Sequence, residues 1–229
     1  MGIASEIRQE VKKIFKTAWT TRKGTTVPDV DDLKLGNDAV TFEAVVLYAD
    51  MADSTWLATN MKESFAAEVY KSYLVSACRC IRENEGEITA FDGDRVMGVF
   101  VEGNKNTNAA KTALNISWCR KLINEEIKDY YSSIEYTLKQ SVGVDKSKVF
   151  VARTGIRGSN DLVWVGGAPN YAAKLCALRD GAYASWITEP IYQSLLDSSK
   201  CSNGTDMWTR REWTEYNRIV YASTWTWEP

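Results

Sequence analysis

Two strand-like stretches that carry aspartates at one end constrain the fold of this chain more than any other feature. The first, VVLYADMAD (residues 45–53), is an apolar run that stops at Asp50. The second, FDGDRVMGVF (91–100), starts on an acidic turn that contains Asp94. Short runs rich in β-branched and aromatic residues, bounded by turn formers, predict buried strands. A carboxylate at the end of such a strand is costly to bury unless a cation or hydrogen bonds compensate.

Two such carboxylates on adjacent strands would make a site for a hard divalent cation, Mg²⁺ or Mn²⁺. The local sequence leaves a structural alternative equally open. In that alternative Asp50 caps the next helix, and Asp92-Gly93 forms an ordinary hairpin turn.

The periodicity of apolar residues predicts helices and strands along the whole chain. Helices are expected at 4–19, about 53–82, 104–130, 169–179 and about 190–197, and strands at 40–49, 87–91, 95–101, 140–145, 149–154, 162–165 and 184–188, with a turn at 145–148 and a terminal hairpin within 207–228. The order strand–helix–strand–strand–helix–strand predicts an α+β, ferredoxin-like domain, with an antiparallel-rich central sheet and flanking helices.

The chain divides into an N-terminal helix and linker (1–37), a central domain (38–200) and a tryptophan-rich C-terminal hairpin (201–229). The sequence has nine tryptophans. Tryptophans in such number more often fill a core or a subunit interface than stack on sugars or bases.

Composition excludes several classes of function. The chain has no histidine, which rules out His-dependent triads, His–zinc sites and imidazole acid–base catalysis. Its net charge of -2 gives no support for a nucleic-acid partner or an anionic membrane surface. No apolar run reaches the ~18 residues that a membrane span needs. The five cysteines are an odd number without metal-ligand spacing, which is typical of reduced thiols in a cytoplasmic protein.

Three segments, in this order, resemble the catalytic domain of the class III nucleotidyl cyclases. VVLYADMADSTWLA resembles the first metal motif of that family, and GEITAFDGDRVMGVF resembles the second, an acidic hairpin followed by an apolar strand. NDLVWVGGAPNYAAKL resembles the segment that carries a transition-state Asn and, four residues later, an Arg. The resemblance covers roughly residues 40–190.

The resemblance implies a role for several individual residues. Asp50 and Asp94 would bind two divalent cations, Mg²⁺ or Mn²⁺, and Asn170 would orient the reacting ribose. Lys174 stands where the family usually has Arg, and a lysine offers a point charge in place of a planar fork. No family role is assigned to Asp53 or Asp92, for which structural capping is expected.

In the family the aspartates come from one subunit and the Asn and Arg from the other. The resemblance therefore implies a head-to-tail homodimer with two sites across its interface. The N-terminal helix and the tail are expected to help dimerisation or regulation.

In the class III cyclases two positions usually select the base. The residues at these positions in this sequence do not favour a purine. They are Ala90, four residues before Asp94, and Val163, seven before Asn170. Neither side chain can hydrogen-bond a base edge, and loss of hydrogen-bonding discrimination changes or relaxes base choice. Tyr48, where purine cyclases commonly carry Phe, would narrow the pocket and offer a hydroxyl to a smaller base.

In these features the chain resembles the pyrimidine cyclases of bacterial Pycsar anti-phage defence. That resemblance implies UTP as the favoured substrate, cyclic UMP as the product and a separate effector protein that senses it. The alternatives are a cytidylate cyclase that makes cyclic CMP, an adenylate or guanylate cyclase with an atypical base pocket, and a catalytically dead sensor or dimerisation module. A ferredoxin-like RNA binder is disfavoured, because a basic surface balance and the usual aromatic signature are both missing.

Overall fold

The fold is an α+β arrangement around one large curved sheet. The computed structural model describes residues 2–179 and 182–229. The helices are α1 (Ile3–Lys16), α2 (Ser54–Asn60), α3 (Glu63–Glu83), α4 (Lys105–Tyr130), α5 (Gly167–Cys176), α6 (Glu189–Gln193) and α7 (Asp197–Lys200), with 3-10 turns η1 (Val30–Asp32) and η2 (Thr214–Tyr216). The strands are β1 (Thr20–Lys23), β2 (Asp38–Ala52), β3 (Glu87–Asp92), β4 (Arg95–Phe100), β5 (Lys139–Ile156), β6 (Ser159–Gly166), β7 (Ser185–Thr188), β8 (Cys201–Ser202), β9 (Thr205–Asp206), β10 (Thr209–Trp213) and β11 (Arg218–Ser223).

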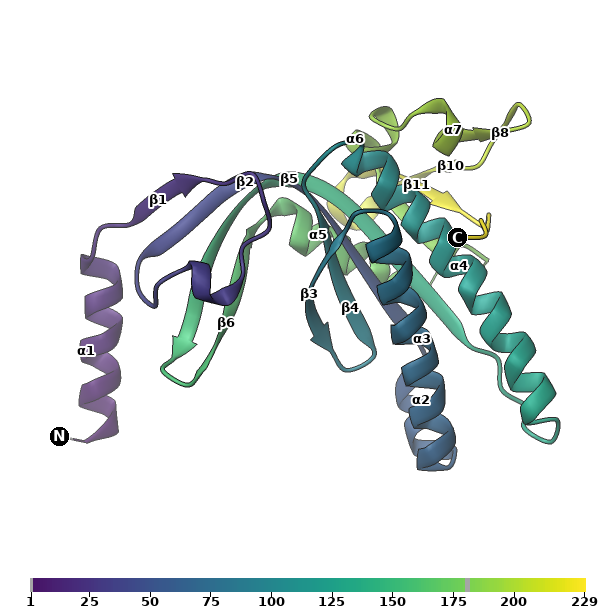
Figure 1. Cartoon of the computed structure of the whole chain (residues 1–229), viewed down its shortest axis with the longest axis horizontal. Helices are drawn as coiled ribbons and strands as arrows, with labels where there is room; N and C mark the ends of the chain where they lie inside the picture. The colour runs from purple at the N-terminus through teal and green to yellow at the C-terminus, as the bar shows by residue number, and fades with distance from the viewer. Residues whose placement is uncertain (1, 180–181) are drawn as a thin grey trace.

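The central sheet has the strand order β10-β11-β7-β5-β2-β4-β3, with β1 paired to β2 and β6 paired to β5. Most neighbours are antiparallel, whereas β1 with β2 and β5 with β7 run parallel. The long strands β2 and β5 arch over the middle of the molecule and carry the other strands on both flanks (Figure 1). The predicted α+β fold with a central sheet and flanking helices is confirmed.

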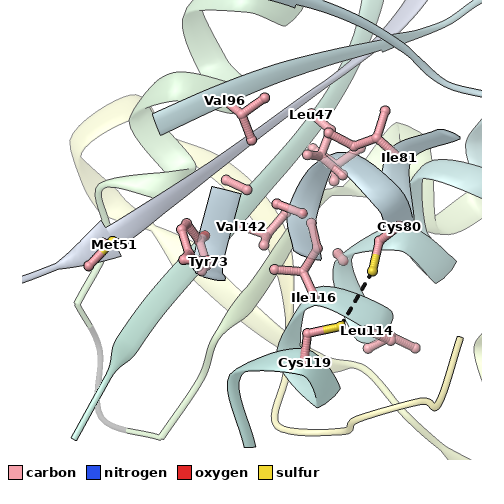
Figure 2. Packing of buried hydrophobic residues seen from close by; sticks show 14 of the residues in the cluster. Leu47, Met51, Tyr73, Cys80, Ile81, Val96, Leu114, Ile116, Cys119 and Val142 are labelled. Carbon is pink, nitrogen blue, oxygen red and sulfur yellow. Dashed lines mark hydrogen bonds between the residues drawn. The ribbon is translucent and has the colours of Figure 1, made fainter. Parts of the chain in front are cut away.

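Helices cover both faces of the sheet. Successive side chains of β2 point to opposite faces, and both faces carry apolar residues that the helices bury. Val45, Leu47 and other residues of one face join the large cluster formed with α3 and α4. Figure 2 shows part of this cluster, including the buried pair Cys80 and Cys119, whose sulfur atoms lie 3.6 Å apart. Val46 and Tyr48, on the other face, pack with Ala168 and Ala172 of α5. The face covered by α5 carries Asp50 as well.

Several predicted boundaries are wrong. Residues 145–148 form no turn. They continue β5 because they pair with 43–46 of β2, so cross-strand pairing overrides the local turn signal. The helix expected at 53–82 is divided into α2 and α3, and the helix expected at 169–179 spans only Gly167–Cys176. The linker after α1 contains β1, which pairs with β2.

The terminal hairpin is confirmed as β10 and β11, and β11 pairs with β7, so the tail extends the central sheet. Trp186, Trp208 and Trp213 are buried, as expected of core tryptophans. Trp19, Trp56, Trp225 and Trp227 are each more than one-third exposed in the single chain, so they do not belong to its core. All described residues of α1 are exposed, and this helix stands at the opposite end of the molecule from α3 and α4 (Figure 1).

A glycine sets the distance between α5 and the sheet. A Cβ at Gly143 would lie 2.2 Å from the Ala172 carbonyl oxygen and 2.5 Å from the Cys176 backbone nitrogen. Because both atoms belong to the backbone, no rotamer change relieves the overlap. We expect Gly143→Ala to lower the free energy of unfolding by more than about 3 kcal/mol in urea denaturation.

The matched control for this prediction is Gly167→Ala at the start of the same helix. A Cβ at Gly167 meets no atom closer than 3.7 Å, so this variant should unfold at nearly the same urea concentration as the parent. A Gly143→Ala protein of unchanged stability would show that α5 is free to move away from β5.

Candidate active site

Asp50 lies on the α5 face of the sheet, between two neighbouring strands. In the strand register it is opposite Arg95 of β4 and opposite Ser141 of β5. Its side chain is 19% exposed, and its Oδ2 accepts a hydrogen bond from Arg179 Nη2 at 3.1 Å. Burial and the nearby charge of Asp94 raise the pKa of the Asp50 carboxyl, although Arg179 pulls this pKa down.

Asp94 lies in the turn between β3 and β4, next to Arg95 and therefore close to Asp50. Its Oδ2 is buried and has no hydrogen-bond partner among the described residues. A buried carboxylate oxygen without a partner is costly. A divalent cation would give this oxygen a partner. Its positive charge would also offset the repulsion between the Asp50 and Asp94 carboxylates. The two aspartates thus fit a hard cation.

The other two aspartates of these stretches are held differently. Asp92 forms an ion pair with Arg95 at 2.7 Å. Asp53 occupies the N-cap position of α2 with a positive φ of 59°, and its side chain makes no capping hydrogen bond, so the expected side-chain cap is wrong. Its carboxylate is 3.9 Å from Lys139 Nζ.

Tyr48 and Ala90 lie on the same face of the sheet, and their role as two parts of one base pocket stays a prediction. Both are paired neighbours of Met97, Tyr48 on one side of β4 and Ala90 on the other. Both pack in the same cluster. The Arg95 guanidinium carbon lies 5.4 Å from the centroid of the Tyr48 ring, and burial raises the pKa of the Tyr48 hydroxyl.

Val163 lies on β6, whose neighbouring residues approach β3. A hollow of about 230 Å³ is lined by residues 87–89 of β3 and by Asp161 and Leu162 of β6. Along β6 the burial alternates, so Val163 is on the opposite face from Leu162 and is 39% exposed. Within one chain the described contacts do not bring Val163 to Ala90 or Tyr48, because its side chain is on the outer face of β6.

Asn170 and Lys174 lie one turn apart on the exposed side of α5. Asn170 Nδ2 donates a hydrogen bond to the Gly166 carbonyl oxygen at 3.2 Å. Lys174 Nζ donates to the Tyr216 hydroxyl and lies 4.4 Å from the centroid of that ring. This hydrogen bond raises the pKa of Lys174. Within one chain the described contacts bring neither Asn170 nor Lys174 to Asp50 or Asp94.

Sequence reasoning missed Arg179. Its guanidinium donates to Asp50 and also to the backbone oxygens of Cys176 (2.6 Å) and Leu178 (3.1 Å). These contacts fix it beside the aspartate pair. Because Arg179 lies in the loop after α5, beyond the periodic part of the helix, no local pattern signals it. Its role follows only from the tertiary contact with β2.

Solved structures with the same fold include guanylyl and adenylyl cyclases, although no protein-family model matches the chain. The guanylyl cyclase Cya2 is 14% identical with a TM-score of 0.67, over 82% of this chain and 95% of that one. The adenylyl cyclase CyaB from P. aeruginosa is 17% identical with a TM-score of 0.63, over 81% and 95%. At these identities the likeness establishes the fold. That fold is the fold of the class III nucleotidyl cyclases.

The sequence relatives narrow the class. A uridylate cyclase of Xanthomonas perforans is 44% identical over 230 residues, covering 99% of both chains. A uridylate cyclase of Burkholderia cepacia is 41% identical over the same length and share. The chain belongs to the uridylate cyclase family. In the described part of the chain, no helix combines the length and apolar character that a membrane crossing requires.

Proposed function

We propose that this protein converts UTP to 3′,5′-cyclic UMP and pyrophosphate, with two divalent cations bound at Asp50 and Asp94. One observation carries the mechanism: a buried, unpartnered carboxylate oxygen of Asp94 lies next to a second strand-end aspartate. The choice of UTP is supported by the full-length uridylate cyclase relatives.

The chemistry is an in-line attack of the ribose 3′-oxygen on the α-phosphate with loss of pyrophosphate. Bound cations would lower the pKa of the attacking hydroxyl and neutralise charge on the phosphates. Asp50 and Asp94 would hold these cations, and Arg179, which donates to Asp50, would add a third positive group beside them. Because the chain has no histidine, the site depends on carboxylates and cations for proton removal.

A second copy of the chain completes the site. Asn170 and Lys174 are exposed on α5 and do not contact the aspartates of their own chain. In a head-to-tail homodimer, Asn170 would orient the ribose and Lys174 would place its charge on the phosphates. The contact with Tyr216 restrains the Lys174 ammonium, which makes up in part for the planar fork that an arginine would supply.

Tyr48 and Ala90 form the proposed base-binding region of one chain, whereas Val163, the third predicted base-selecting residue, has its side chain on the opposite face of the sheet. Tyr48 and Ala90 lie on either side of Met97 and make an apolar wall, to which Arg95 adds a positive charge above the Tyr48 ring. Apart from the Tyr48 hydroxyl, the side chains of such a wall offer a base edge no hydrogen bond. A pyrimidine is smaller than a purine, so it would fit the pocket that Tyr48 narrows and would reach the Tyr48 hydroxyl.

The substrate is tested by incubating the pure protein with Mn²⁺ and each of the four nucleoside triphosphates in separate reactions. We expect cyclic UMP to form at least about tenfold faster than any other product, the level that loss of hydrogen bonds to a wrong base supports. Liquid chromatography with mass spectrometry measures the products. Dominant cyclic CMP would mean that the substrate is CTP and that the preference for a pyrimidine holds. Dominant cyclic AMP or cyclic GMP would overturn the pyrimidine proposal.

We further propose that residues 38–200 form the catalytic unit of a cytoplasmic anti-phage defence enzyme. A separate effector protein would read its product. Segments 1–37 and 201–229 would assist dimerisation or regulation, since α1 is fully exposed in the single chain and the tail extends the same sheet as the catalytic strands.

A further inference from the structure

The buried face around Asp50 contains a serine whose hydroxyl has no partner. Ser141 is 1% exposed, and its Oγ makes no hydrogen bond to any described residue. Three other buried serines differ. The hydroxyls of Ser117 and Ser185 lie 3.1 Å apart, and Ser223 donates to the Met207 carbonyl oxygen at 2.6 Å. An interior hydroxyl without a partner opposes folding, and an alanine would fill almost the same space.

The strand register places this hydroxyl beside a candidate metal ligand. Ser141 of β5 is directly opposite Asp50 of β2 in the antiparallel ladder. Directly opposite residues project their side chains to the same face, with Cβ atoms about 5 Å apart. The two side chains are therefore close enough for Oγ to reach the carboxylate once both adopt suitable rotamers.

The carboxylate has capacity for such a donor. Among the described hydrogen bonds, Asp50 Oδ2 accepts one from Arg179, and none is assigned to Oδ1. Arg95, opposite Asp50 on the other side, directs its guanidinium to Asp92. Ser141 is thus a neutral donor that the sheet itself holds next to Asp50. Unlike Arg179, it brings no positive charge that would compete with a cation.

We infer that Ser141 is a positioning residue for Asp50: its hydroxyl hydrogen-bonds the carboxylate and orients it toward the divalent cation. This inference rests on the proposed metal site. Partners of this kind fix a ligand's orientation, and removing one typically weakens metal binding 10–100-fold. The unmet hydrogen bond of Ser141 is satisfied when Asp50 turns to hold the ion.

The test measures Mn²⁺ binding to the full-length protein in the presence of a non-cyclising UTP analogue. Electron paramagnetic resonance reports the concentration of free Mn²⁺. Ser141→Ala should weaken Mn²⁺ binding about tenfold or more. Its melting temperature without metal should stay the same or rise, because the variant loses an unpartnered interior hydroxyl. Ser223→Ala is the matched control. It should lower the melting temperature by several degrees, because its hydroxyl bonds the Met207 carbonyl oxygen and the Trp225 backbone N–H. It should leave Mn²⁺ affinity unchanged, because neither of these described hydrogen bonds involves a candidate metal ligand.

Asp50→Asn separates this inference from the proposed function. If Asp50→Asn abolishes Mn²⁺ binding and Ser141→Ala binds Mn²⁺ as tightly as the parent, the Ser141 assignment is overturned and the metal site stands. If the parent protein binds no Mn²⁺, the metal site fails and the Ser141 assignment fails with it. A Ser141→Ala protein that loses stability and keeps its affinity would assign the hydroxyl to packing alone.

Discussion

Asp94→Asn and Asp50→Asn are each expected to lower the kcat for cyclic UMP formation by about a thousandfold or more. An amide supplies no charge to a divalent cation, and the loss of one cation's stabilisation of the transition state amounts to several kcal/mol, at about 1.4 kcal/mol for each factor of ten. Product formation is measured under saturating UTP and Mn²⁺. Asp53→Asn is the control from the same stretch. Among the described ion pairs its exposed side chain makes one, with Lys139, and Asn tolerates its positive φ, so kcat should stay within about threefold.

The stability of Asp50→Asn has a predictable sign. The pKa of Asp50 is raised in the folded protein by burial and by Asp94, so folding favours the neutral carboxyl over the ionised one. A neutral Asn should therefore give a metal-free protein that melts no lower than the parent at neutral pH. As the pH falls through the raised pKa toward the ordinary value of 3.8, the parent becomes protonated and the difference should disappear. A variant that unfolds at neutral pH would mean that Asp50 is a structural residue.

Mixing two inactive proteins is expected to restore activity if the site is shared between subunits. Asp50→Asn removes the metal half of the site, and Asn170→Ala removes the ribose-orienting half. In a mixed two-fold dimer one site contains both defects and the other contains none. With random exchange, about half of the dimers are mixed and each has one working site, so we expect about one quarter of the parent activity.

The control pair for this mixture is Asp50→Asn with Asp94→Asn. Both changes affect the same half-site, so each site of a mixed dimer has one damaged ligand, and no activity should return. Activity is followed over time after denaturant-free mixing, because subunit exchange limits recovery. Absence of rescue in the first mixture, after mass spectrometry has shown that mixed dimers form, would contradict a site across the interface.

The sequence predicted the places of Asp50 and Asp94 in the fold, and their role as metal ligands stays a prediction. Asp50 and Asp94 stand at the ends of short apolar runs, and strand ends are determined by local hydrophobicity and turn residues. The pair Tyr48 and Ala90 also followed from position alone, and the structure places both beside Met97. Fold class followed from the order of elements.

Local signals failed where distant pairing decided the outcome. The Asp145-Lys146-Ser147-Lys148 segment has the composition of a turn, but hydrogen bonding to β2 along its whole length keeps it extended. Asp53 is a residue type that often caps helices. In the structure it has a positive φ, and its side chain makes no capping hydrogen bond. The outward-facing side of β6 at Val163 likewise depends on its pairing with β5.

By itself the sequence determined that a chain without histidine carries two strand-end aspartates followed by an Asn and a Lys at fixed spacing. Only the tertiary structure decided what surrounds them. It put Arg179 and Ser141 beside Asp50 and turned Asn170 and Lys174 to the exposed face of α5. The physical reason is range. Strand ends and helix starts are encoded by a few neighbouring residues, whereas register and cross-sheet contacts depend on the packing of the whole chain.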